Sequence, residues 1–262
     1  MVIATVLAFG LSVGTTAPAT GASVGCPQHF ARGAEPALAN AKLAQAARRL
    51  CFSSFAVLHS GVSRTPLWSA ERLTRASAEK AQALDTRDNR FHAEERLPPS
   101  ERAELADYNR SGFDRGHMAP SGDMGDARSD YESFSLANIV PQAGALNRNS
   151  WAALEGYVRD LAIRFGEAYV VTGPAYEGTR LRRLKGRVLV PTSVWKAVNV
   201  PDQGAGAWIA TNQARPKWEV VSIATLAQRT GVDPFPALDA ATKARVPAFP
   251  TFGGGKQRRR GR

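Results

Sequence analysis

The chain has 262 residues, with 34 lysines and arginines against 23 aspartates and glutamates, so its formal net charge is +11 with the four histidines neutral. Hydrophobic residues make up 44% of the sequence, which excludes a disordered chain. Two cysteines exclude a metal site built from cysteines, and the lack of any recurring period excludes repeat and coiled-coil architectures. The positive charge favours an anionic partner, with nucleic acid as the first candidate and an anionic membrane surface as the second.

The N-terminal segment carries no Asp, Glu, Lys or Arg before Arg32. Met1 to Val13 is almost wholly apolar and is followed by small residues, which predicts a secretory signal peptide over residues 1–23 rather than a transmembrane helix. No Lys or Arg precedes the apolar run, which departs from the usual signal peptide. We therefore expect an exported protein, periplasmic or extracellular, without stable membrane association. In an exported protein Cys26 and Cys51 most simply form one disulfide, with two buried free thiols as the alternative.

The first half of the chain predicts helix, strands and loops in turn. Apolar residues at helical spacing predict a helix over residues 35–50. Aromatic and aliphatic runs predict strands over 52–58 and 67–73, and the polar stretch 75–91 indicates a loop with some helix. A turn is expected at Ala119–Gly122, and a short strand is expected over 136–140 before Pro141.

The second half contains the clearest helix, over residues 151–165, with Ser150 as its expected N-cap and Gly166 as its C-terminal stop. Further strands are predicted over residues 168–172, 187–190, 194–200 and 207–211, and a last helix over 222–230. This mixed order favours an α+β fold. Without a long internal linker, residues 24–252 are expected to form a single domain, followed by a disordered basic tail over residues 253–262.

The segment Asp114-Arg115-Gly116-His117 packs an acid, a base, a glycine and a histidine into four positions. Phosphodiester hydrolysis needs a base that takes a proton from water, which neutral imidazole provides near pH 7. It also needs fixed positive charge at the phosphate, which a guanidinium provides. His117 and Arg115 supply these two groups, and Asp114 is expected to hold Arg115 or the local backbone. A buried salt bridge beside a core histidine is the structural alternative.

A second cluster contains Asn138, Asn147 and Glu155. If a helix begins near Asn147, eight residues at about 100° each leave Asn147 and Glu155 about 80° apart and two turns along. An amide oxygen and a carboxylate then approach one hard cation, and Mg²⁺ prefers such oxygen ligands while keeping several waters. The alternative is that Asn147 caps the helix and Glu155 is solvated.

These two clusters together resemble the DNA/RNA non-specific endonuclease family, specifically from about Arg90 to Phe165. The resemblance implies a ββα-metal fold, with a central, mainly antiparallel sheet flanked by helices. It implies that His117 is the general base, Asn147 the single direct protein ligand of the metal, and Glu155 the residue that orients metal-bound water. Further residues that it implies are Arg115 at the phosphate, Asn138 as a supporting polar residue, and an upstream arginine, either Arg90 or Arg87.

The function implied is that of an Mg²⁺-dependent endonuclease, with Mn²⁺ or another divalent ion as a substitute. Its expected substrates are single- and double-stranded DNA and RNA, hydrolysed to 5′-phosphorylated products with little sequence preference. Contacts to backbone phosphates rather than to base edges account for such non-specificity. The competing hypotheses are a non-catalytic, basic nucleic-acid-binding protein that retains the fold and an enzyme of the same fold that cleaves a different phosphodiester.

Overall fold

The computed structural model describes residues 25–85 and 90–252, and its central element is a seven-stranded sheet. The strand order is β12-β11-β10-β7-β4-β3-β2, and every neighbouring pair is antiparallel. Short two-stranded ribbons join β1 to β13, β5 to β6 and β8 to β9. The expected α+β class, with a mainly antiparallel sheet flanked by helices, is confirmed.

The strands are β1 (Ala37–Leu38), β2 (Ala47–Cys51), β3 (Phe55–Ser60), β4 (Thr65–Thr74), β5 (Asp114–His117), β6 (Ile139–Gln142), β7 (Glu167–Ala175), β8 (Arg183–Leu184), β9 (Val188–Leu189), β10 (Ser193–Val200), β11 (Gly204–Thr211), β12 (Trp218–Val221) and β13 (Val232–Asp233). The α-helices are α1 (Arg75–Gln82), α2 (Leu105–Tyr108), α3 (Ala127–Ser133), α4 (Ala152–Phe165), α5 (Ile223–Thr230) and α6 (Ala240–Ala244). Residues 1–24, 86–89 and 253–262 lie outside the described residues, and so do the predicted signal peptide and basic tail.

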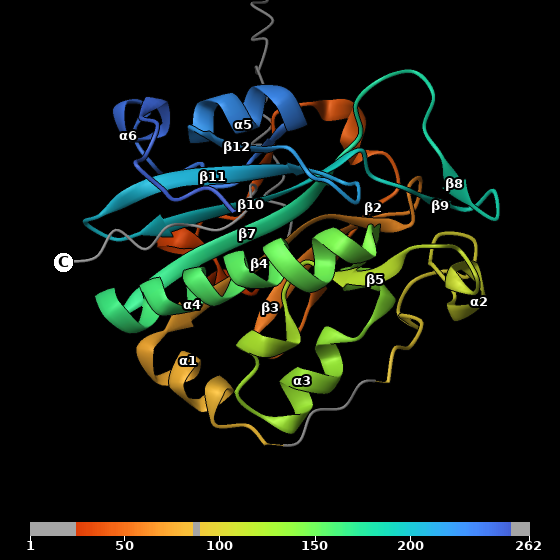
Figure 1. Ribbon diagram of the computed structural model, residues 1–262, viewed down its shortest axis with the longest axis horizontal. Helices are drawn as coiled ribbons and strands as arrows, with labels where there is room; N and C mark the ends of the chain where they lie inside the picture. The colour runs from red at the N-terminus through yellow and green to blue at the C-terminus, as the bar shows by residue number, and fades with distance from the viewer. Residues whose placement is uncertain (1–24, 86–89, 253–262) are drawn as a thin grey trace, which may run out of the picture.

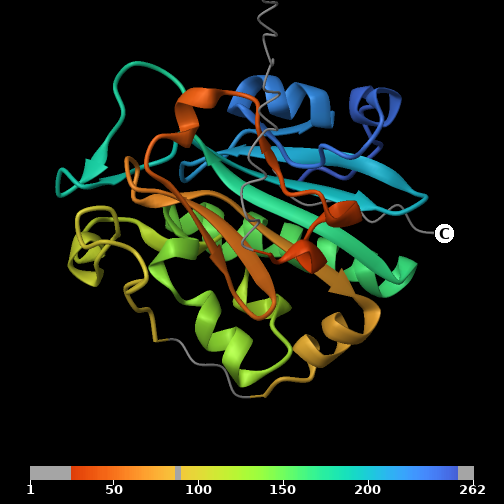
Figure 2. The ribbon, with the colours of Figure 1, turned by 180° about the vertical axis from the view of Figure 1, so that it is seen from behind.

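Helices cover both faces of the large sheet, as Figures 1 and 2 show from opposite sides. On one face α4 packs through Leu154, Val158 and Ala162 against inward residues of β4, β7, β10 and β11. On the other face α5 and the segment that contains Cys26 bury a second apolar cluster. Because side chains alternate along each strand, the same central strands contribute to both clusters. The strands β3 and β10 are accordingly buried along their whole length.

The two helices predicted in the second half are confirmed, but one cap is not. Gly166 ends α4 with φ of 99°, and its N–H donates to Ala162 O. Ser222 caps α5 by accepting from Thr225 N, 3.1 Å away. Ser150 is not an N-cap, because the chain is already helical before α4: residues Leu146–Trp151 form a π-helical turn. The N-cap position of α4 is Trp151, which has helical φ and ψ.

The helix expected over residues 35–50 is wrong. The segment instead forms β1, a 3₁₀ turn over Ala41–Ala44 and β2. Ala46 has φ of 51°, in the left-handed region, so a continuous helix cannot pass through it. Leu50 is buried and Leu38 is half-buried, but by separate elements: Leu38 pairs with β13 and Leu50 with Val57 of β3. Pairing with the edge of the sheet therefore overrides the helical spacing.

The strand expected over residues 136–140 is half right. Leu136–Asn138 is a 3₁₀ turn, and the strand β6 begins at Ile139 and includes Pro141. A two-stranded ribbon has only edge strands, where a proline is tolerated. The strand predicted over residues 187–190 is mainly the second arm of the β8–β9 ribbon. The sequence patterns did not predict β12, α2 or α3 as separate elements.

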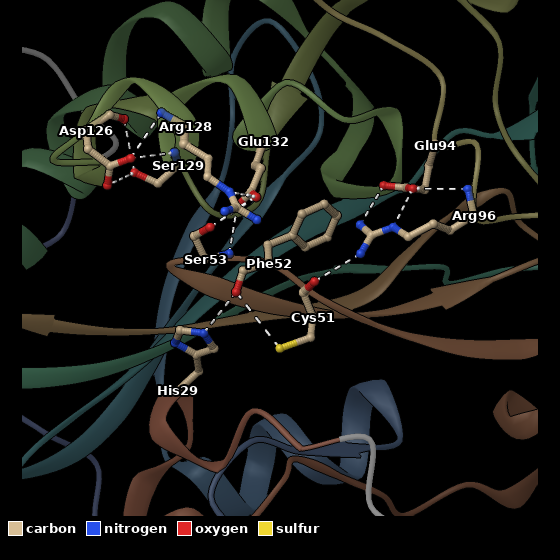
Figure 3. A network of polar contacts seen from close by, with 10 residues as sticks. All are labelled: His29, Cys51, Phe52, Ser53, Glu94, Arg96, Asp126, Arg128, Ser129 and Glu132. Carbon is tan, nitrogen blue, oxygen red and sulfur yellow. Dashed lines mark hydrogen bonds and ion pairs between the residues drawn. The ribbon is translucent and has the colours of Figure 1, made fainter.

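A polar network ties the turn between β2 and β3 to the helical layer (Figure 3). Ser53 donates from its backbone N–H and its hydroxyl to Glu132 of α3, at 2.6 and 3.0 Å. Arg96 pairs with Glu94 at 2.7 Å and donates to Cys51 O at 3.0 Å. These contacts fix the segments that follow Arg90 and precede Phe134 against the sheet.

A disulfide joins Cys26 to Cys51, as predicted, and closes a separation of 25 residues. It attaches the N-terminal segment to the end of β2, on the sheet face that α5 covers. Within residues 25–85 and 90–252, no helix is both long and apolar enough to cross a bilayer.

We expect Cys26→Ser/Cys51→Ser to lower the free energy of unfolding by about 3 kcal/mol, because the unfolded chain regains the entropy of a 25-residue loop. Urea unfolding of the oxidised wild type and the double variant measures this difference. Reduced wild type is the control, because it should match the variant. Equal midpoints for the oxidised wild type and the variant would show that the bridge does not constrain the unfolded chain.

Candidate active site

The β5–β6 ribbon presents two of the predicted residues on one side. Side chains alternate along a strand, so Arg115 and His117 share one face of β5 while Asp114 lies on the other. Phe91 packs between them: its ring lies 4.4 Å from the Arg115 guanidinium carbon and 5.4 Å from the centre of the His117 ring. Sequence reasoning missed Phe91, although it follows Arg90 directly. It spaces the guanidinium from the imidazole.

The imidazole of His117 is held in an apolar environment. The ring of Phe134 meets it edge to face at 4.7 Å, and the buried Nε2 atom has no hydrogen-bond partner within the described residues. Burial lowers the pKa of His117 to about 4, and the nearby Asp130 carboxylate opposes this shift. The imidazole is therefore neutral at pH 7 and can accept a proton, while Asp130 favours the imidazolium that results.

Gly116 is required by a close contact inside the ribbon. A Cβ atom at this position would lie 2.0 Å from Oε1 of Gln142, a fully buried residue from the neighbouring strand. Neither side-chain polar atom of Gln142 has a hydrogen-bond partner among the described residues. Gln142 thus occupies the space beside this glycine.

Asp114 joins the ribbon to the start of the helical run before α4. Its carboxylate accepts 2.8 Å from Arg148 Nε and 3.1 Å from Asn147 Nδ2. The hydrogen bond from Arg148 holds the pKa of Asp114 below its usual range, and the Asn147 amide contributes in the same direction. Asp114 was expected to hold Arg115 or the local backbone; its ion-pair partner is Arg148, while Arg115 lies on the opposite face of β5. Asp114 also fixes the side-chain amide of Asn147.

The relation between Asn147 and Glu155 differs from the one expected. Asn147 lies in the π-helical turn and Glu155 in the first turns of α4, so a uniform step of about 100° does not describe the segment. Glu155 is half-buried. Desolvation raises its pKa to about 7; Lys196 opposes this shift, Asp123 adds to it, and Arg159 opposes it. Desolvation thus disfavours the ionised carboxylate, and a cation bound beside it would restore the ionised form.

Several charged residues behind Glu155 were missed by sequence reasoning. Lys196 of β10 is 1% exposed and donates to Thr172 Oγ1 at 2.7 Å and to Met118 O at 3.4 Å. Glu71 of β4 is buried, and neither carboxylate oxygen has a hydrogen-bond partner among the described residues. Burial raises its pKa, and the nearby Asp123 carboxylate adds to the shift.

Two signals in the sequence point to this charged group. Lys196 is a single cation within an apolar strand, and such a residue is rarely buried without a role. Arg159 follows Glu155 by four residues on α4 and therefore shares its helix face. In the structure Arg159 pairs with the buried Asp123 at 2.7 Å.

Asn138 supports the site rather than facing it. It is fully buried; its amide donates to Ala119 O at 2.8 Å and Ser133 O at 2.9 Å, and its oxygen accepts from Ala119 N and Ser69 Oγ. These four bonds occupy the whole side chain. The residue thus ties the stretch after His117 to β4.

The upstream arginine is only partly placed by the structure. Arg90 is exposed and precedes Phe91 directly, and its guanidinium carbon lies 5.9 Å from the centre of the Tyr131 ring. Arg87, the alternative, lies outside the described residues.

The residues near Asp114 fit a hard cation with few protein ligands. Asp114 holds the Asn147 amide nitrogen, so the amide oxygen is the atom left to bind an ion, and Glu155 offers carboxylate oxygens. Across the described residues, the one compact group of three His, Cys, Asp or Glu ligand atoms is Cys26, His29 and Cys51, where the cysteines form the disulfide. A single amide oxygen with a carboxylate nearby suits Mg²⁺, which retains most of its waters.

Comparison with known proteins finds nucleases by family model, by sequence and by structure. The model of the family described as DNA/RNA non-specific endonuclease matches residues 35–241. Nuclease C1 of Cunninghamella echinulata var. echinulata is 36% identical over an alignment of 176 positions that covers 62% of this chain and 70% of that protein. A nuclease of Nostoc sp. is 36% identical over 59% of this chain and 55% of its own length. A crystal structure of the EndoG/EndoGI complex matches with a TM-score of 0.66 and 27% identity, over 76% of this chain and 89% of that one.

We expect His117→Gln to remove part of the acid sensitivity of the fold. The pKa of His117 falls from 6.5 in the unfolded chain to about 4 in the fold, so the unfolded state binds more protons between these values. The wild type should therefore lose about 3 kcal/mol more than the variant as the pH falls from 6.5 to 4. Urea unfolding of both proteins across this range measures the difference. The raised pKa of Glu155 affects the stability of both proteins equally, so it does not contribute to the difference. If the free energies of unfolding of wild type and variant changed with pH in parallel, a neutral imidazole with a lowered pKa at His117 would be contradicted.

Proposed function

The chain belongs to the DNA/RNA non-specific endonuclease family of metal-dependent nucleases, and from this premise we propose that it is an exported, Mg²⁺-dependent enzyme that hydrolyses DNA and RNA to 5′-phosphorylated products. The observation that carries the proposal is the shared face of β5. A neutral imidazole and a guanidinium lie there on either side of Phe91. The domain that performs the reaction is proposed to span residues 24–252.

In this proposal His117 takes the proton from the attacking water. Its pKa of about 4 keeps the imidazole neutral at the working pH, and the Asp130 carboxylate stabilises the charge that the proton brings. The apolar rings of Phe91 and Phe134 fix the ring plane and exclude other water from it. The base is therefore oriented by packing rather than by a hydrogen-bonded carboxylate at its buried nitrogen.

Arg115 is proposed to bind the scissile phosphate. Its guanidinium stacks on Phe91 and forms no ion pair with a carboxylate in the part of the chain that the structure describes. An unpaired guanidinium can offer two parallel N–H groups to phosphate oxygens, and its charge stabilises the transition state. The stacking on Phe91 limits the conformations that must be lost when phosphate binds.

A divalent cation would be held by the Asn147 amide oxygen with Glu155 nearby, and there it would supply Lewis-acid stabilisation of the phosphate and the leaving oxygen. Asp114 keeps the amide oriented by holding its nitrogen. Glu155 orients water by accepting hydrogen bonds once its carboxylate is ionised. Mg²⁺ is the ion that we propose, with Mn²⁺ or another divalent ion as a substitute.

The proposed substrates are DNA and RNA, both single- and double-stranded. The groups that act in the site are an imidazole, a guanidinium and oxygen ligands, all suited to a phosphodiester and not to a base edge. Such contacts are common to every sequence and to both sugars. The net charge of +11 adds long-range attraction for either polymer.

Export to the periplasm or beyond is supported by two features. The apolar N-terminal run over residues 1–23 has the character of a signal peptide. The Cys26–Cys51 disulfide is of the kind that persists in oxidising compartments.

Supercoiled plasmid and a structured RNA, each incubated with Mg²⁺ and with Mg²⁺ plus chelator, test the proposed activity. We expect nicking and then degradation of the plasmid, loss of the RNA, and neither in chelator. The products should accept a 5′ label from polynucleotide kinase only after phosphatase treatment. A chain that shifts both polymers on a gel without cutting either would instead be the non-catalytic binding protein.

Substitution separates the base from the metal ligand. His117→Ala should lower the cleavage rate by about 10²–10⁴-fold and leave the Mg²⁺ midpoint unchanged, because the imidazole is not a proposed ligand. Asn147→Ala should raise the Mg²⁺ midpoint by about tenfold or more, because the ion loses its protein oxygen. Cleavage rates measured across a Mg²⁺ titration give both quantities.

Asn149→Ala is the matched control, since Asn149 lies in the same turn but donates only to Ala145 O at 2.9 Å. It should behave as wild type. If His117→Ala moved the Mg²⁺ midpoint strongly and Asn147→Ala did not, the two assignments would be reversed.

A further inference from the structure

A basic hairpin lies beside the candidate active site. Residues 180–187 contain four arginines and one lysine and no acid: Arg180, Arg182, Arg183, Lys185 and Arg187. The strands β8 and β9 form its arms, and it projects from the same end of the molecule as β5 and α2 (Figures 1 and 2). Building on the proposed function, we propose that this basic hairpin binds the phosphate backbone of the nucleic acid on one side of the scissile bond.

The hairpin is anchored to the core beneath the site. Leu184 and Val188 are buried with Ile139 of β6 in one apolar cluster, which Phe91 and Phe113 border. Leu189 N donates to Ser63 O at 2.9 Å, which ties β9 to the turn between β3 and β4. Its apolar residues thus face inward, so the cations are held on a fixed support rather than on a free loop.

The tip of the hairpin is a tight turn. Lys185 and Gly186 both have positive φ, 46° and 73°, and Arg187 N donates to Leu184 O at 2.8 Å. Positive φ at both central residues is the geometry that matches the twist of a two-stranded ribbon. The turn directs the exposed side chain of Lys185 away from the core.

Arg182 connects the hairpin to the segment that carries the catalytic residues. Its guanidinium carbon lies 4.9 Å from the centre of the Phe113 ring, and its Nη2 donates to Ser111 O at 3.3 Å. Phe113 directly precedes Asp114, the first residue of β5. Arg182 is exposed, so its charge remains available to a ligand beside β5.

Most of this positive charge is not neutralised by the protein. Within the described residues, only Arg187 of the hairpin forms an ion pair with a carboxylate, that of Asp107 at 2.9 Å. Arg183 donates only to backbone carbonyls, at Val62 and Arg187. The acid nearest along the chain, Glu177, is paired with Arg229. Four cations therefore remain exposed at one place.

A neighbouring arginine shows the effect of this crowding. Burial lowers the pKa of Arg64, and the charges of Arg187 and Arg183 lower it further while Asp107 opposes them. Its Nη1 is buried with no hydrogen-bond partner among the described residues. Repulsion among these like charges is relieved when an anion binds, which favours a polyanion over a neutral partner.

The spacing sets which part of the substrate the hairpin reaches. Four residue steps separate Phe113 from His117, and at about 3.3 Å per strand residue they span about 13 Å. Duplex phosphates of one strand advance about 3.4 Å per base pair along the axis, so the contact falls about four base pairs from the scissile bond. A short substrate cannot reach it, whereas a long one can.

The test compares two double variants. The hairpin variant is Arg182→Glu/Lys185→Glu, and the control variant is Arg32→Glu/Arg245→Glu. The second pair is exposed beside a cavity that Tyr169 and Leu238 also line, away from the hairpin, and it changes the net charge by the same amount. For a duplex of about 30 base pairs, the hairpin variant should raise KM by about fivefold to tenfold with kcat within about twofold. Its plot of log KM against log salt should be shallower by about 0.9 for each phosphate that the hairpin no longer neutralises. The control variant should match wild type.

A thymidine dinucleotide is the second substrate, and all three proteins should cleave it at equal rates. Equal effects of both variants on the duplex would overturn the proposal, since net charge alone would then act. A loss of dinucleotide cleavage in the hairpin variant would also overturn it, by showing that the hairpin shapes the catalytic residues. A wild type that cleaves neither substrate would refute the proposed function itself, whereas a wild type that cleaves both leaves that function standing whatever the hairpin variant does.

Discussion

The carboxylate of Asp114 holds together two parts of the site that are far apart in the sequence. The candidate base lies on β5, while the candidate metal ligand lies on the helical run before α4, 33 residues after Asp114. Asp114 accepts from Asn147 and Arg148 of that run, at 3.1 and 2.8 Å. A hydrogen bond from the Asn147 amide nitrogen to this carboxylate fixes the side-chain amide in one orientation. Without this link the amide oxygen would have no defined position.

Behind this link lies a buried group of charges that the sheet supplies. Lys196 and Glu71 project from β10 and β4, and Asp123 and Arg159 form an ion pair beside them. Charges are costly to bury, and replacing such groups by apolar residues is often stabilising. We therefore explain their presence under Glu155 by their effect on its pKa. Asp123 raises this pKa, whereas Lys196 and Arg159 lower it. The sheet thus shapes the electrostatics of the site as well as supporting it.

The sequence predicted the parts of this protein that depend on local patterns. The apolar stripe of α4, the central strands and the Cys26–Cys51 bridge follow from spacing and composition. The motif from Asp114 to His117 predicted the segment on which the candidate site is built, because its residue types are those that phosphodiester chemistry requires. Alternation along a strand is equally local, yet the pairing of Asp114 with Arg148 was not predicted, since the strand β5 is too short for its pattern to stand out.

What could not be predicted depends on contacts between distant segments. The edge strand β2 exists because β3 needs a partner, and that pairing overrode helical spacing over residues 35–50. Phe91 lies between Arg115 and His117 only after the chain has folded back from β4 to β5. The π-helical turn before α4 has no sequence signature of its own and changes the angular relation of Asn147 to Glu155. Such features are settled by packing rather than by local pattern.

The core under α4 draws on residues that are far apart in the sequence, from Leu73 to Phe252. Trp208 of β11 stacks on Phe249 at 4.5 Å, and a Cβ at Gly206 would lie 2.1 Å from Pro247, so the last described segment closes directly over the sheet. Contacts of such wide sequence separation form late in folding. A chain still emerging from a ribosome or a translocation channel therefore lacks the residues that complete this core. Assembly of α4 on its sheet is therefore completed only after synthesis has passed Phe252.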